Sequence, residues 1–67
     1  SRILRFNNEL VRSIDHTQED FDEILGIIDA YRTYCRTHEE YKNNKCTHAI
    51  ANIERCYDDR LEKNDFL

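Results

Sequence analysis

The chain has 67 residues, with one Gly, no Pro and no Trp, 36% charged residues and a formal net charge of −4. This length suits one small domain, and the near absence of turn-forming residues excludes an all-β sandwich or barrel. Acids and bases are spread evenly over both halves of the sequence, so we expect neither nucleic acid nor an anionic membrane as a partner.

The first predicted helix runs from about Arg2 to Ile14, and Ser1 is its candidate N-cap. Apolar residues recur every three or four positions, which places them on one face of a helix. The inward residues are Ile3, Phe6, Leu10 and Ile14.

The second predicted helix begins after Thr17 and extends to about Tyr41. Thr17, followed three residues later by Asp20, resembles a capping box. Gly26 lies inside this helix, where Gly costs about 1 kcal/mol relative to Ala; close approach of another helix would explain it, but so would no structural role. The inward stripe comprises Phe21, Ile24, Ile28, Tyr31, Cys35 and His38, and it is widened by Ile27, Tyr34 and Tyr41.

The third predicted helix runs from about Thr47 to Lys63, after a loop at 42–45, and Asn44 or Thr47 would cap it. Its inward residues are Ala49, Ile50, Ile53, Cys56, Tyr57 and Leu61. A short turn makes the second and third helices an antiparallel hairpin over residues 17–63. We therefore predict an all-α, three-helix, disulfide-linked bundle that forms one domain over residues 1–67.

The hairpin geometry predicts which cysteines meet. With the turn centred near 44–45, Cys35 and Cys56 face each other at nearly equal height, so a Cys35–Cys56 disulfide is the natural pair. Cys46 would be left over at the hairpin tip, unpaired or joined to a second molecule. Such a bond in a small domain indicates a secreted, extracellular protein. Three reduced cysteines in a cytosolic protein are the alternative.

Zinc is a competing explanation for these residues, with Cys35, His38 and Cys56 as ligands of the type that zinc prefers. Cys46 and Cys56 lie about 15 Å apart along one helix, too far for one ion, and the three-residue set lacks a fourth ligand. We therefore predict no metal and no other cofactor. No activated nucleophile or converging pair of carboxylates is present, so we expect no enzymatic activity.

Four side chains near the end of the second helix are candidate binding residues. Aromatic and Arg side chains are enriched at interface hot spots. The set consists of Arg32, Tyr34, Arg36 and Tyr41. The alternative is that the tyrosines cover the first helix.

The segment from Cys35 to Asp65 resembles the last third of insect odorant-binding proteins and their salivary relatives. The resemblance rests on the spacing Cys35-x10-Cys46-x9-Cys56, with Ala49 and Tyr57 at matching positions. It implies a bond between the first and third cysteines, with the middle one bonded to an earlier helix. The chain is also similar in general character to mosquito salivary antiplatelet domains that bind collagen, and its C-x9-C pair to helical hairpins of the mitochondrial intermembrane space.

The leading hypothesis is a secreted, non-enzymatic helical binding module of arthropod saliva or venom, acting on a host macromolecule or a small ligand. The first alternative is a structural or assembly protein joined as a homodimer through Cys46. The second is a zinc-stabilised intracellular adaptor. The longest uncharged apolar stretch, Ile24–Ile28, is far shorter than the about 20 residues that span a bilayer. We therefore expect no membrane anchor and no remaining signal peptide, and the absence of Met predicts a processed product or a fragment.

Overall fold

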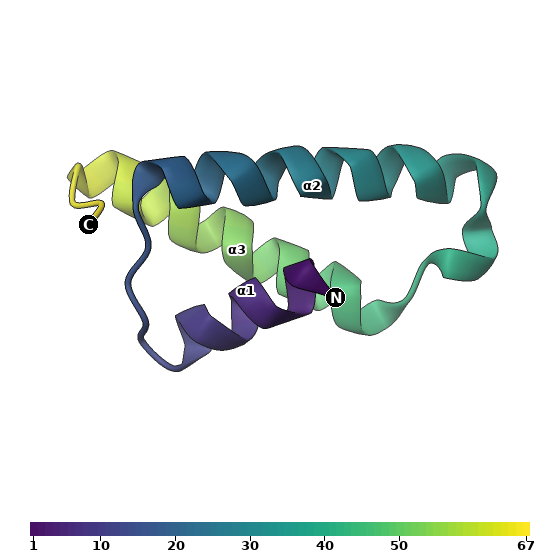
Figure 1. The fold of residues 1–67 in the computed structure, drawn as a ribbon, viewed down its shortest axis with the longest axis horizontal. Coiled ribbons are helices and arrows are strands. Elements are labelled where there is room, and N and C mark those ends of the chain that lie inside the picture. The colour runs from purple at the N-terminus through teal and green to yellow at the C-terminus, as the bar shows by residue number, and fades with distance from the viewer.

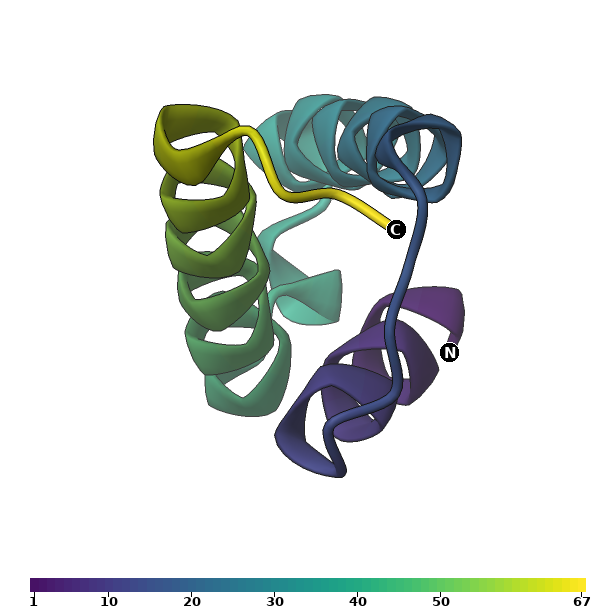
Figure 2. The ribbon, with the colours of Figure 1, turned by 90° about the vertical axis from the view of Figure 1, so that its left-hand side faces the viewer.

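The computed structural model describes all residues from Ser1 to Leu67 and contains three α-helices and no strands, which confirms the all-α, three-helix prediction. Helix α1 spans Arg2–Val11, α2 spans Gln18–Thr37 and α3 spans Asn44–Lys63, with a 3-10 turn, η1, at Glu39–Tyr41. Helices α2 and α3 run in opposite directions along the long axis (Figure 1). Seen almost along α2, they are splayed rather than closely parallel, and α1 lies across their open side (Figure 2). None of the helices combines the length and apolar character needed to cross a bilayer.

The helices begin where local side-chain chemistry satisfies their first backbone N–H groups. Ser1 Oγ accepts from Leu4 N at 3.4 Å. Thr17 and Asp20 form the predicted capping box, with both reciprocal hydrogen bonds at 3.0 Å. α3 begins earlier than predicted because Asn43, rather than Asn44 or Thr47, is its N-cap and accepts from Cys46 N at 2.8 Å.

α1 ends at Val11, three residues before the predicted end. Ser13 adopts a left-handed conformation with φ 63°. Its N–H donates to Leu10 O at 3.0 Å, and the N–H of Ile14 donates to Glu9 O at 2.9 Å. These two bonds form a Schellman motif, which terminates a helix by satisfying its last carbonyls. Ile14 therefore leaves the helical face and is 42% exposed, contrary to its predicted inward position.

α2 ends at Thr37 rather than near Tyr41, because two side chains contact the backbone carbonyl that would otherwise accept the next helical hydrogen bond. His38 Nδ1 lies 3.0 Å from Tyr34 O, and Thr37 Oγ1 donates to the same oxygen at 3.4 Å. His38 itself leaves the helical conformation, with φ −137° and ψ 64°. The connection to α3 consequently runs over residues 38–43 instead of 42–45.

The core is formed by one cluster to which all three helices contribute. Its buried members are Ile3, Phe6, Phe21, Ile24, Ile28, Ala49, Ile50 and Ile53. All of these were predicted to face inward. The C-terminal segment adds Phe66, whose ring centroid lies 5.7 Å from that of Phe21 and which was not predicted. Leu61 was predicted to face inward but is 51% exposed, because it lies beyond the region that the other helices cover.

The predicted Cys35–Cys56 disulfide is not present: all three cysteines are free thiols, and no two lie at disulfide distance. The prediction matched their heights around a turn at 44–45, whereas the true connection is centred several residues earlier. The splay of α2 and α3 then directs Cys35 toward the start of α3 and Cys56 toward Leu10 and Ile14. Cys46, expected at the hairpin tip, is only 5% exposed in the first turn of α3.

Candidate functional site

A groove of about 560 Å³ opens between the end of α2, the connection and the start of α3. Such volumes are typical of sites for small molecules, which fall at about 300–1,000 Å³. Its lining combines apolar and charged side chains: Tyr31, Arg32, Cys35, Arg36, Glu39, Lys42, Thr47 and Ile50. Two of the predicted binding residues, Arg32 and Arg36, are among them. The groove is therefore a concave surface on which this chain could hold a small ligand.

Arg32 is held in place by a salt bridge between α2 and α3. Its two terminal nitrogens each lie 3.0 Å from a different carboxylate oxygen of Glu54. The hydrogen bonding to Glu54 raises the pKa of Arg32 further above its ordinary range. Because Glu54 occupies both donors in a bidentate arrangement, Arg32 acts as a wall of the groove rather than as a free cation.

Arg36 and Lys42 differ from Arg32 because no acidic side chain forms an ion pair with either of them. Both are exposed at the groove, and Glu39 is the one acidic residue that lines it. Three bases and one acid thus surround this groove in a chain whose net charge is −4. Lys42 and Glu39 were not predicted as site residues, because a loop lysine and an acidic doublet carry no local signal of a groove.

Tyr31 fixes the connection against α2. Its hydroxyl donates to Tyr41 O at 3.3 Å and accepts from Asn43 N at 3.4 Å. Burial is the main cause that raises the pKa of Tyr31, and hydrogen bonding to Cys35 adds to it. The phenol therefore shapes one wall of the groove as a neutral group.

The predicted residues Tyr34 and Tyr41 do not line the groove; they form an exposed aromatic cluster with His38. Tyr34 and His38 are stacked with ring centroids 3.9 Å apart, and Tyr41 meets Tyr34 edge-on at 5.3 Å. Tyr34 is 47% and Tyr41 56% exposed. The alternative that the two tyrosines cover the first helix therefore does not hold.

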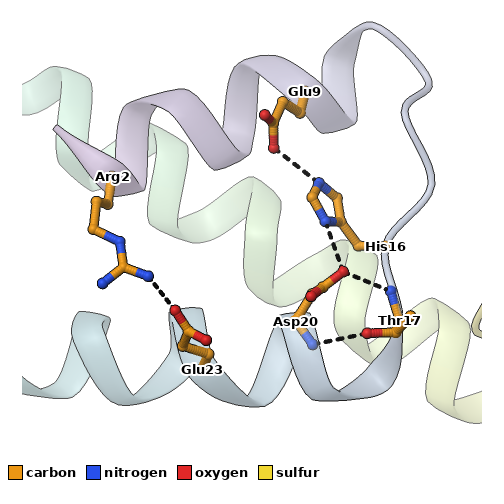
Figure 3. Close-up of polar contacts among 6 residues, drawn as sticks. All are labelled: Arg2, Glu9, His16, Thr17, Asp20 and Glu23. Carbon is orange, nitrogen blue, oxygen red and sulfur yellow. Dashed lines mark hydrogen bonds and ion pairs between the residues drawn. The ribbon is translucent and has the colours of Figure 1, made fainter.

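A second polar cluster joins α1 to α2 at the opposite end of α2 (Figure 3). His16 lies between two carboxylates: its Nε2 is 3.0 Å from Glu9 Oε1, and its Nδ1 is 3.2 Å from Asp20 Oδ2. The contact with Glu9 has the distance of an ion pair but not the geometry of a hydrogen bond. The imidazole also stacks on Phe6 with ring centroids 4.2 Å apart. Arg2 and Glu23 form a further ion pair between the same helices.

Asp20 is the member of this polar cluster whose titration is shifted. The backbone N–H of Thr17 is the main cause that lowers the pKa of Asp20, followed by the hydrogen bond from His16. Sequence reasoning identified the capping role of Asp20 but missed His16. A single His after a helix does not indicate from the sequence which acids it contacts, because those contacts form only when the neighbouring helices pack together.

No group of three or more His, Cys, Asp or Glu side chains is arranged to hold a metal ion. In particular, Cys35 lines the groove, whereas Cys56 faces a separate hollow beside Leu10 and Ile14. The residues of the zinc alternative, Cys35, His38 and Cys56, therefore do not converge on one point.

Comparisons with family models, with curated proteins and with solved structures found no match to this chain.

Proposed function

We propose that this protein is a non-enzymatic binding module that holds a small, partly apolar ligand in the groove between α2 and α3. The observation that carries this proposal is the groove of about 560 Å³, with Tyr31, Cys35 and Ile50 on its apolar wall. The resemblance of the C-terminal half to insect odorant-binding proteins supports a small ligand.

The other expected activity, contact with a host macromolecule, would use the exposed cluster of Tyr34, His38 and Tyr41. The homodimer alternative is less favoured, because Cys46 is buried and would need local opening before it could bond to a second molecule. The zinc adaptor is less favoured because its ligands lie apart.

Fluorescence titration with phenylnaphthylamine, a neutral aromatic probe, tests the proposed function. We expect saturable enhancement that is abolished by Thr47→Tyr, since this exposed residue lines the groove. The matched control is Thr33→Tyr, which places the same side chain at an exposed position of α2 outside the groove. Equal binding by both variants would contradict the location, and no binding by the native protein would contradict the function.

Alkylation of the cysteines provides a second readout of occupancy. Cys35 lines the groove but is only 8% exposed, so it reacts through local opening of the groove wall, which bound phenylnaphthylamine should suppress. The modification of Cys56, which lies outside the groove, should not change. Trypsin separates the two residues, because Cys35 falls in the peptide 33–36 and Cys56 in the peptide 56–60. Mass spectrometry of these peptides therefore reports on both sites in one digest, with Cys56 as the internal control.

A further inference from the structure

Basic side chains outnumber acidic ones around the groove, and the basic side chains differ in whether an acid forms an ion pair with them. Arg32 is committed to Glu54 through two bonds of 3.0 Å. Arg36 and Lys42 come from different elements, the last turn of α2 and the connection, and neither forms an ion pair. Glu39 alone opposes them. An overall acidic chain thus leaves two uncommitted cations at one concave surface.

We propose that the ligand of this groove is a small organic anion with an apolar body, whose head group is held by Arg36 and Lys42. The inference rests on the proposed function and adds the chemical class of its ligand. Guanidinium and ammonium groups complement a carboxylate or sulfonate through charge-assisted hydrogen bonds.

The apolar wall argues for an amphiphile rather than an inorganic anion. Tyr31, Cys35 and Ile50 are the three apolar residues that line the groove, with Tyr31 half-buried and Cys35 and Ile50 8% and 4% exposed. Arg36 and Lys42 are exposed, so their attraction for a bare, well-hydrated ion is weak. Burial of an apolar body adds roughly 25 cal/mol for each Å² removed from water, so it would supply most of the affinity, while the cations select the charge.

Two matched fluorescent probes separate the contribution of charge from that of shape. Anilinonaphthalene sulfonate carries the sulfonate that phenylnaphthylamine lacks on the same ring system. We expect the native protein to bind the anionic probe about two- to fivefold more tightly, the range expected for one or two exposed ion pairs. This preference should shrink at about 1 M salt, where the screening length falls to about 3 Å.

Single neutralising variants test the residues by name. Arg36→Gln and Lys42→Gln should each weaken binding of the anionic probe by up to about twofold, so that together they account for its preference, and leave the neutral probe unchanged. Glu39→Gln should tighten binding of the anionic probe, because it removes the one acid at the groove. The matched controls are Glu40→Gln, the neighbouring exposed acid that does not line the groove, and Arg12→Gln, an exposed base just after α1.

Competition distinguishes an amphiphile from a free ion. Decanoate should displace the anionic probe at concentrations at which inorganic phosphate does not. Equal displacement by phosphate, or equal affinity for the two probes with no effect of Arg36→Gln and Lys42→Gln, would overturn the assigned ligand class while leaving the proposed binding function in place. Failure of both probes to bind and to protect Cys35 would instead remove the proposed function. Circular dichroism of every variant confirms that the helices are retained.

Discussion

At the scale of single residues, the Asp20 carboxylate makes two different stabilising contacts. It accepts the N–H of Thr17 at 3.0 Å, which closes the capping box of α2, and it lies 3.2 Å from His16 Nδ1. His16 in turn lies 3.0 Å from Glu9 on α1. The charged form of Asp20 therefore supports both the start of α2 and the attachment of α1.

The pH dependence of the melting temperature should show how much the charged Asp20 carboxylate stabilises the fold. The pKa of Asp20 is lowered in the folded state below its ordinary value of 3.8, chiefly by the Thr17 N–H. A lowered folded-state pKa means that the stabilisation is complete above the unfolded-state value and is lost as the pH falls through the folded-state value. We expect Asp20→Asn to lower the melting temperature near neutral pH, and the difference from the native protein to shrink below about pH 4. Thermal melts followed by circular dichroism between neutral pH and about pH 2 measure this difference.

The control for this prediction is Asp22→Asn, which changes an exposed acid in the same region of α2 that forms no ion pair. Its effect on the melting temperature should vary less with pH than that of Asp20→Asn. Identical pH profiles for the two variants would show that the contacts of Asp20 with Thr17 and His16 do not stabilise the charged form.

At the scale of helices, Gly26 is a weak point of α2 that nothing in the fold requires. A Cβ atom added there would meet nothing within 4 Å, which answers the question that the sequence left open. We expect Gly26→Ala to raise the free energy of unfolding by about 1 kcal/mol, because Ala loses less backbone entropy in a helix. For a domain of this size the gain corresponds to an increase of roughly 4–8 °C in melting temperature.

The reverse exchange at Ala30, an exposed position of the same helix, is the matched control and should lower stability by a similar amount. Denaturant titration of both variants measures the two changes. A destabilising Gly26→Ala combined with a normal Ala30→Gly would contradict the open space around Gly26 and indicate that another part of the chain packs closely against it.

The starts of α1 and α2 could be predicted from the sequence, whereas their ends could not; for α3 the end at Lys63 was predicted and the start was not. The capping box of Thr17 and Asp20 is a local pattern, visible in four consecutive residues. The end of α2 depends instead on competition among Thr37, His38 and the backbone for one carbonyl, that of Tyr34. Apolar periodicity continues past that point in the sequence, so the pattern overestimates the length of the helix.

At the scale of the whole molecule, this error in the end of α2 accounts for the incorrect cysteine geometry. Moving the connection from 42–45 to 38–43 changes which residues of α3 stand opposite Cys35. The splay of the helices cannot be read from periodicity, because a stripe specifies which side is buried but not the crossing angle. The same limitation explains why Arg36 could be predicted as a site residue and Lys42, which reaches the groove only through the connection, could not.

The core is so small that one buried residue contributes a large share of the stability of the whole fold. Ile53 is completely buried, and it belongs to the cluster that joins all three helices. Ile53→Ala should cost about 2–5 kcal/mol and Ile53→Val about 0.5–1.5 kcal/mol, because each leaves a cavity that the helices cannot fill. Proteins are stabilised by roughly 0.05–0.15 kcal/mol per residue, which is about 3–10 kcal/mol for a chain of this length, so a loss near 5 kcal/mol would remove half of the stability or more.

The effect of Leu61→Ala on stability distinguishes the structure from the sequence pattern, because the two place Leu61 differently. Periodicity placed Ile53 and Leu61 on the same inward face, whereas the structure leaves Leu61 51% exposed. We therefore expect Leu61→Ala to change the free energy of unfolding by less than about 1 kcal/mol, well below the cost at Ile53. Urea titrations of the three variants measure these differences. Comparable losses at Ile53 and Leu61 would mean that α3 is covered along its full length, by closer packing of α1 and α2 or by a second molecule.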